Sequence, residues 1–225
     1  MQHNADTGPA DESRSSLLRG QTTESTPHRI AASAVELILE KGYRGTSVDD
    51  IVAHAGLTKP TFYYHFDSKL ELLTAVLHNS LARIEDALAS AENLDIPPRK
   101  RLSELVKAYV LEVCDRPGLW TIYFSERKEI PSETLLHWKK RERTMVAVIE
   151  RTIEAGIAEG EFRQADALIA AMSVMGMAGW LHHWFRPSGA LTAGAIATAM
   201  ASLACDGLRL PSTETSRLSS ERVSG

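Results

Sequence analysis

The side chains best suited to bind another molecule lie close together in residues 59–66. Phe62 and Phe66 are four residues apart, so in a helix they point to the same side, towards a core. The other surface then carries an ammonium group, hydroxyl groups and an imidazole, from Lys59, Thr61, Tyr63, Tyr64 and His65. Groups of this kind hydrogen-bond to phosphates and to the edges of bases. The segment is therefore a candidate binding surface.

Two short helices joined by a tight turn are expected to position these side chains. Ser47 can cap the first helix, and Asp50 can reach back from three residues further on. Gly56 can end it, because glycine adopts the left-handed conformation without steric cost. Thr58 can cap a second helix with Pro60 in its first turn, where a missing N–H is tolerated. This pattern predicts a helix-turn-helix whose second helix fits a major groove.

The segment GTSVDDIVAHAGLTKPTFYYHFDSKLELL, within residues 27–78, resembles the DNA-binding signature of the TetR family of bacterial transcriptional regulators. The resemblance implies a homodimer that binds a palindromic operator in double-stranded DNA. It also implies that a small molecule entering a C-terminal helical domain releases the operator. Contacts with base edges or flanking phosphates are implied for Lys59, Pro60, Thr61, Tyr63 and Tyr64. Contacts with the phosphate backbone are implied for Ser47, Thr58, His65 and Lys69.

The charge of the chain gives no separate support for a nucleic-acid partner. The formal net charge is −4, and residues 27–78 hold five Lys and Arg against six Asp and Glu. A basic surface is the usual first sign of a DNA-binding protein. The DNA prediction therefore depends on the motif. Affinity has to come from helix N-termini, hydroxyl groups and a few well-placed cations.

Apolar residues recur at helical spacing through most of the chain, and no strand-like alternation of useful length is present. The pattern predicts an all-α protein of about nine helices, the first of them capped by Thr26. They are expected at residues 26–41, 47–55, 58–66, 68–91, 99–115, 119–128, 132–159, 166–185 and 192–208. The helix over 68–91 would be roughly 35 Å long, which makes it the natural lever between the DNA-binding helices and the rest.

Composition and breaks in the pattern predict four parts. Residues 1–26 and 211–225 are polar and hold too little apolar surface to offset the entropy of ordering, so both are expected to be flexible. Residues 27–78 form the DNA-binding domain, with its motif at 47–66. Residues 79–210 form a helical domain for ligand binding and dimerisation.

The last two helices combine small and bulky apolar residues at helical spacing. Small residues such as Gly176, Ala197 and Ala201 allow close approach of a neighbouring helix, and bulky ones such as Met172 and Leu203 fill its holes. On a monomer this surface would be an oversized apolar patch. In related regulators these helices pair with a second subunit, so we predict a homodimer, with a purely internal core as the alternative.

An aromatic cluster could line a ligand cavity between helices of the C-terminal domain. It consists of Trp120, Tyr123, Phe124 and Trp138, together with Met145. Clefts with mixed aromatic and apolar walls are typical of small-molecule sites. Filling of the core is the alternative for each residue taken singly.

A second segment, GMAGWLHHWFRP at residues 176–187, is similar to a C-terminal pattern of TetR regulators that sense acyl-CoA thioesters. The similarity is short. It implies an acyl-CoA as the small-molecule effector, with Trp184 near the site. It also implies Arg186, and with it Arg141 or Arg143, as partners of the CoA phosphates; a solvated or capping arginine is the alternative for each.

Other classes of function find little support. His137, His182 and His183 have no carboxylate or Cys at ligand spacing, so we predict neither a metal site nor a cofactor. Cys114 and Cys205 lack metal-ligand spacing and are expected to be buried thiols in a reducing cytosol. We find no secretory signal, no apolar run of ~20 residues for a membrane span, and no nucleophile elbow, phosphate loop or paired carboxylates.

The prediction is a cytoplasmic, ligand-responsive, dimeric TetR-like regulator that acts as a repressor and is not an enzyme. One alternative is a small all-α enzyme acting on acyl thioesters, which lacks a visible catalytic constellation. Another is a DNA-binding module without ligand control, which would leave the size and aromatic content of residues 92–210 unexplained.

Overall fold

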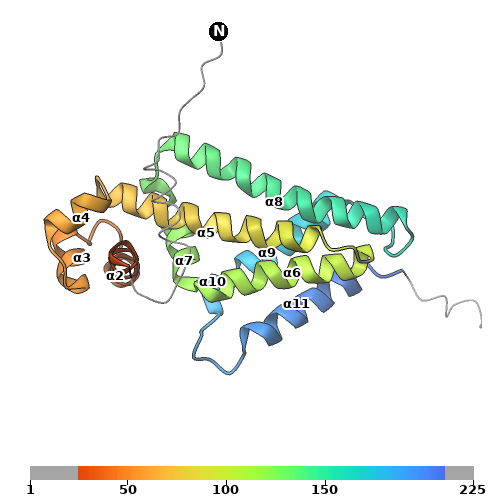
Figure 1. Ribbon diagram of the computed structural model, residues 1–225. Helices are drawn as coiled ribbons and strands as arrows, with labels where there is room; N and C mark the ends of the chain where they lie inside the picture. The colour runs from red at the N-terminus through yellow and green to blue at the C-terminus, as the bar shows by residue number, and fades with distance from the viewer. Residues whose placement is uncertain (1–24, 211–225) are drawn as a thin grey trace, which may run out of the picture. The chain divides into compact units, whose positions relative to one another are not determined.

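The computed structural model describes residues 25–210, and over that range every regular element is a helix. In chain order (Figure 1), the helices are α2 (Thr26–Lys41), α3 (Val48–Ala55), α4 (Lys59–His65), α5 (Lys69–Glu92), α6 (Pro98–Asp115), α7 (Pro117–Ser125), the 3-10 helix η1 (Arg127–Glu129), α8 (Ser132–Ala158), α9 (Ala167–Gly179), α10 (Leu181–Trp184) and α11 (Ala193–Gly207). The all-α prediction is confirmed. Within residues 25–210, no helix has the length and apolar character needed to cross a membrane. The arm and tail expected at the two ends lie almost wholly outside the described residues.

Each of the nine expected helices is present in this range, with differences in their bounds; the helix expected over 119–128, for example, ends at Ser125 and is followed by η1. Ser25 is the N-cap residue of α2, so the prediction that Thr26 caps it is wrong by one residue. Helix α7 already begins at Pro117, because the fixed φ and missing N–H of proline suit a first turn. The helix expected at 166–185 is divided at Trp180 into α9 and the four-residue α10. Gly176 and Gly179 weaken helix formation just before this break.

Residues 25–84 and 116–141 belong to one compact unit. Its N-terminal part is a three-helix arrangement in which α2 contacts both α3 and α4 (Figure 1). Ile30, Ile51 and Phe62, one from each helix, are fully buried. Gly42 and Gly56 follow α2 and α3 with φ of 77° and 63°, and the left-handed conformation predicted for Gly56 is confirmed. The two glycines that end α2 and α3, and one apolar core shared by all three helices, therefore determine this arrangement.

Helix α7 packs against α2 in the same unit. Leu39 of α2 meets the backbone of α7 at Gly118, where an added Cβ would lie 2.5 Å from the Leu39 side chain. Arg44, which follows α2, donates a hydrogen bond from Nε to the Glu129 carboxylate of η1 at 2.9 Å. The packing of α7 on α2, together with the ion pair between Arg44 and η1, thus joins this aromatic segment to the N-terminal helices.

Residues 85–115 and 142–210 belong to the second compact unit. Helices α6 and α11 lie side by side in it (Figure 1), and Arg99 and Asp206 form an ion pair between them at 3.0 Å. Cys114 and Cys205 are buried free thiols, as predicted. Burial raises the pKa of the Cys114 thiol to about 11, so this thiol is unreactive at neutral pH.

The structure differs from the prediction for α11 in where two alanines lie. Ala197 and Ala201 are 2% and 1% exposed within the chain itself, so they fill its own core and not a surface open to a partner. The large exposed apolar side chains of α9 and α11 are instead Leu168, Ile169, Met172 and Leu203. The periodicity of small residues could not separate these two faces, because both carry alanine.

Candidate functional site

The second helix of the helix-turn-helix, α4, has one buried face and one exposed face. Phe62 is 0% exposed and Phe66 6%, and their ring centroids are 5.9 Å apart. Tyr63 and Tyr64 are 51% and 81% exposed. The two phenylalanines therefore hold the helix against the core, and both tyrosines are left on the outer surface.

The N-terminus of α4 carries the other polar groups expected to bind. Thr58 is the N-cap residue, but its hydroxyl group forms a hydrogen bond with the Thr61 hydroxyl at 2.9 Å and does not cap the helix backbone. Lys59 forms an exposed ion pair with Asp49 of α3 at 2.9 Å. The hydrogen bond to Asp49 raises the pKa of the Lys59 ammonium. Lys59 is therefore held as a cation at the start of α4, and Pro60 beside it is exposed.

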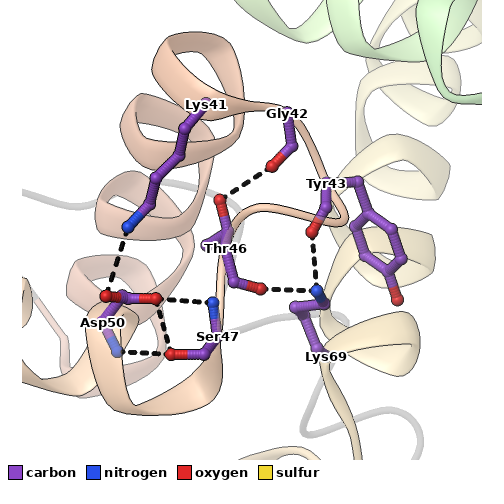
Figure 2. A network of polar contacts seen from close by, with 7 residues as sticks. All are labelled: Lys41, Gly42, Tyr43, Thr46, Ser47, Asp50 and Lys69. Carbon is purple, nitrogen blue, oxygen red and sulfur yellow. Dashed lines mark hydrogen bonds and ion pairs between the residues drawn. The ribbon is translucent and has the colours of Figure 1, made fainter.

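The first helix of the motif begins with a reciprocal cap (Figure 2). The Asp50 N–H donates to Ser47 Oγ at 3.1 Å, and the Ser47 N–H donates to Asp50 Oδ2 at 2.7 Å. Lys41 pairs with the same carboxylate at 3.2 Å. The hydrogen bonds from Ser47, with a smaller contribution from Lys41, lower the pKa of Asp50 to about 2. The capping box predicted from the sequence is confirmed.

Lys69 reaches from the start of α5 to the turn that precedes α3 (Figure 2). Its Nζ donates to the carbonyl oxygens of Tyr43, at 2.6 Å, and Thr46, and lies 4.0 Å from the centre of the Tyr43 ring. Burial lowers the pKa of Lys69, against the nearby charges of Glu129, Asp50 and Glu126. Lys69 therefore holds the turn before α3 in place. The phosphate contacts expected for Lys69, Ser47, Thr58 and the half-buried His65 stay predictions.

Four of the aromatic residues expected at a ligand site come together in the first unit. The Tyr123 ring lies 5.5 Å from Trp120, 5.5 Å from Trp138 and 5.3 Å from Phe124, measured between centroids. Trp120, Tyr123 and Trp138 are buried, and Phe124 is 44% exposed. The other three candidates, Met145, Trp184 and Arg186, belong to the second unit.

In the second unit the three candidates have different environments. Met145 is buried, whereas Trp184 is 42% exposed. Arg186 donates from Nη1 to the carbonyl oxygen of Phe185 at 2.9 Å and, at 3.4 Å, to that of His183. This geometry matches the capping alternative, because Arg186 supplies donors to carbonyl groups at the end of α10.

Some residues of this site were missed from the sequence. Asp49 pairs with Lys59, Arg29 of α2 donates to the carbonyl oxygen of Ala55 at 2.5 Å, and Glu129 pairs with Arg44 from 85 residues away. Contacts between residues on different helices leave no periodic signal in a sequence.

Comparison with known proteins agrees with this arrangement. The family model described as "Bacterial regulatory proteins, tetR family" matches residues 30–76, and "Tetracyclin repressor-like, C-terminal domain" matches residues 95–208. Together they cover both the helix-turn-helix and the helices that follow it.

Individual relatives match this chain over most of their own length. The transcriptional repressor KstR2 of Rhodococcus jostii is 26% identical over 205 residues, which are 90% of this chain and 97% of that protein. A crystal structure of a tetR-family regulatory protein from Rhodococcus RHA1 matches with a TM-score of 0.75 and 26% identity, over 84% of this chain and 100% of that one. The structure of AibR in complex with isovaleryl coenzyme A and operator DNA matches with a TM-score of 0.69 and 28% identity, over 80% of this chain and 97% of that one. This chain belongs to the tetR family of bacterial regulatory proteins and is a DNA-binding transcriptional regulator.

Proposed function

We propose that this regulator is a repressor that binds a palindromic operator as a homodimer and leaves it when an acyl-CoA thioester binds. The observation that carries the proposal is the exposed polar and aromatic face of α4, held outward by the burial of Phe62 and Phe66. Repression is the activity named for KstR2, which this chain matches over 90% of its length. We further propose that the protein acts in the cytoplasm, the compartment that holds its operator, and that it catalyses no reaction.

Helix α4 is proposed to enter the major groove with its N-terminus foremost. In that orientation Lys59, Pro60, Thr61, Tyr63 and Tyr64 face base edges and flanking phosphates. Ser47, Thr58, His65 and Lys69 lie along the sugar-phosphate backbone. With a net charge of −4 over the chain, this local placement has to supply the affinity.

A second copy of the chain is the proposed partner of the apolar face on α9 and α11. Ile169 is 66% exposed, Met172 55% and Leu203 62%, on two helices that contact each other. Side chains of this size at helical spacing are unusual on the surface of a monomer. A two-fold dimer would bury them and would place two α4 helices on two half-sites about 34–36 Å apart.

An acyl-CoA is the proposed effector, and the aromatic cluster of Trp120, Tyr123, Phe124 and Trp138 is proposed to hold its acyl part. Stacked and edge-on aromatic rings offer a large apolar surface to an acyl chain. AibR, whose structure includes isovaleryl coenzyme A, shares the fold at 28% identity. The contact of Arg186 with an anion stays a separate prediction for the second unit, since its remaining guanidinium N–H groups can donate to an anion.

Helix α7 provides the proposed route from effector to DNA. It carries three of the four aromatic residues, packs against α2 and is followed by η1, whose Glu129 pairs with Arg44. A shift of α7 would therefore act on α2, which contacts α4. Effector binding would favour the state in which the two α4 helices no longer match the half-site spacing. Helix α5, which begins at Lys69 beside the turn before α3, is the proposed lever.

Fluorescence anisotropy with labelled DNA from upstream of the protein's own gene tests this proposal. The protein should bind that DNA at least about 10³-fold more tightly than a scrambled duplex. Isovaleryl-CoA or octanoyl-CoA should weaken the binding, and the DNA should weaken acyl-CoA binding by the same factor. Tyr64→Ala should lose operator preference, whereas Leu136→Ala, which removes an exposed side chain on α8, should not.

Two results would contradict parts of the proposal. Equal affinity for upstream and scrambled DNA would remove operator recognition. Binding of DNA that is unchanged by every acyl-CoA, together with no thermal stabilisation by them, would remove the effector class and leave the DNA-binding role in place.

A further inference from the structure

The indole group of Trp138 has an unusual environment. Trp138 lies on α8 and is 0% exposed. Its Nε1–H group has no hydrogen-bond partner, and it is the only buried side-chain nitrogen or oxygen in that state among residues 25–210. Buried polar groups are almost always paired, and an unpaired donor destabilises the fold that contains it. Such a donor therefore calls for a functional explanation.

The Trp138 ring belongs to an aromatic cluster. The centroid of the Tyr123 ring lies 5.5 Å from that of the Trp138 ring, at an interplanar angle of 33°. The Trp120 ring lies 5.5 Å from the Tyr123 ring, at an interplanar angle of 63°. A molecule that fits among these rings needs an apolar body and one hydrogen-bond acceptor, to match the unpaired Trp138 donor.

We propose that the Trp138 indole N–H donates a hydrogen bond to the carbonyl oxygen of the effector's acyl thioester. This inference rests on the acyl-CoA effector proposed above and assigns the group that recognises it. An acyl thioester has an apolar chain with a single strong acceptor, its carbonyl oxygen, close to the chain. The charged nucleotide part of CoA then extends away from the aromatic cluster. The unpaired donor favours the bound state, because binding satisfies it and no existing hydrogen bond has to break.

The competing account is that the indole N–H points at the face of the Tyr123 ring and serves only the core. Nuclear magnetic resonance separates the two accounts. The chain has four tryptophans, so a ¹⁵N-labelled sample gives four indole N–H signals, and Trp138→Phe identifies one of them. If that variant does not fold, Trp120→Phe, Trp180→Phe and Trp184→Phe identify the Trp138 signal by elimination. Isovaleryl-CoA or octanoyl-CoA should move it downfield, as hydrogen bonding to a carbonyl does.

A comparison of two ligands with two proteins tests the contact itself. S-(3-methylbutyl)-CoA and S-octyl-CoA are thioethers that match the two thioesters but lack the carbonyl oxygen. Trp138→Phe should weaken thioester binding by about 5- to 100-fold, because it leaves a buried carbonyl without a donor. It should change thioether binding by less than about twofold. The same measurement on Trp120→Phe, which trims an indole from the same cluster, should show equal effects on both ligand types.

The outcomes are distinct. A Trp138 signal that stays in place or moves upfield, or an equal loss of thioester and thioether affinity in Trp138→Phe, overturns the inference while acyl-CoA remains the effector. Failure of every acyl-CoA to bind the wild-type protein overturns the effector class and this inference with it. A downfield shift together with a thioester-specific loss of affinity supports both.

Discussion

Replacement of Lys69 by methionine separates two roles that this residue could have in DNA binding. The resemblance to TetR regulators implies that Lys69 contacts a phosphate. In the structure its ammonium group holds the carbonyl oxygens of Tyr43 and Thr46, in the turn that leads into the capping box of α3. Methionine keeps the apolar length of the side chain and removes all three donors.

The expected loss of stability follows from those two contacts. A hydrogen bond from a charged donor contributes roughly 1.5–3 kcal/mol in buried sites. Lys69 is only partly buried, so the two bonds together should contribute about 2 kcal/mol after allowance for solvent screening. For a protein of this size, that corresponds to a fall in Tm of roughly 4–8 °C. Thermal unfolding followed by circular dichroism measures it.

The salt dependence of operator binding decides between the two roles. A phosphate contact adds about one unit to the slope of log Kd against log salt concentration, because one counterion is released. If Lys69 acts by positioning the turn, Lys69→Met should bind DNA more weakly with an unchanged slope. Lys59→Met is the matched control, since Lys59 is exposed at the start of α4 and its loss should reduce the slope. A reduced slope for Lys69→Met with an unchanged Tm would refute the positioning role.

Three further predictions follow from the same helices. The pKa of Asp50 is lowered to about 2 in the folded protein, so this group stabilises the fold above its unfolded pKa of ~4 and stops doing so as the pH falls towards 2. Urea unfolding between pH 5 and pH 2 should show a smaller acid-induced loss of stability in Asp50→Asn than in the wild type, and equal losses would contradict the assignment. Phe62→Ala should cost roughly 3–5 kcal/mol of unfolding free energy, because Phe62 is fully buried between the helices of the motif; a loss below about 1 kcal/mol in chemical denaturation would show that α4 is not anchored there. Ile169→Glu combined with Leu203→Glu should give a folded monomer in sedimentation, because both side chains are exposed on the proposed dimer face, whereas Ala197→Glu should unfold the second unit. An intact dimer of the double variant would rule out this face.

Local rules of helix formation made the motif predictable. Ser47 and Asp50 are three residues apart, so their reciprocal cap needs only the first turn of one helix. Gly56 ends that helix because it tolerates a left-handed conformation, which is a property of one residue. Phe62 and Phe66 share a face because they are four residues apart, and this spacing already required a tyrosine to point outward. Interactions between residues no more than four apart can therefore be predicted from the sequence.

Contacts between distant segments could be decided only by the tertiary structure. No sequence pattern indicates that Lys69 bonds to carbonyls 23 and 26 residues away, or that Arg44 pairs with Glu129 across 85 residues. Ala197 and Ala201 have the composition of an interface, yet they face α6 and its neighbours inside the chain. Nor does the sequence reveal that the Trp138 N–H lacks an acceptor, because that depends on every atom packed around it. Spacing along the chain fixes which side chains share a helix face, but the partner of each face depends on how the helices pack, which is set by the whole core.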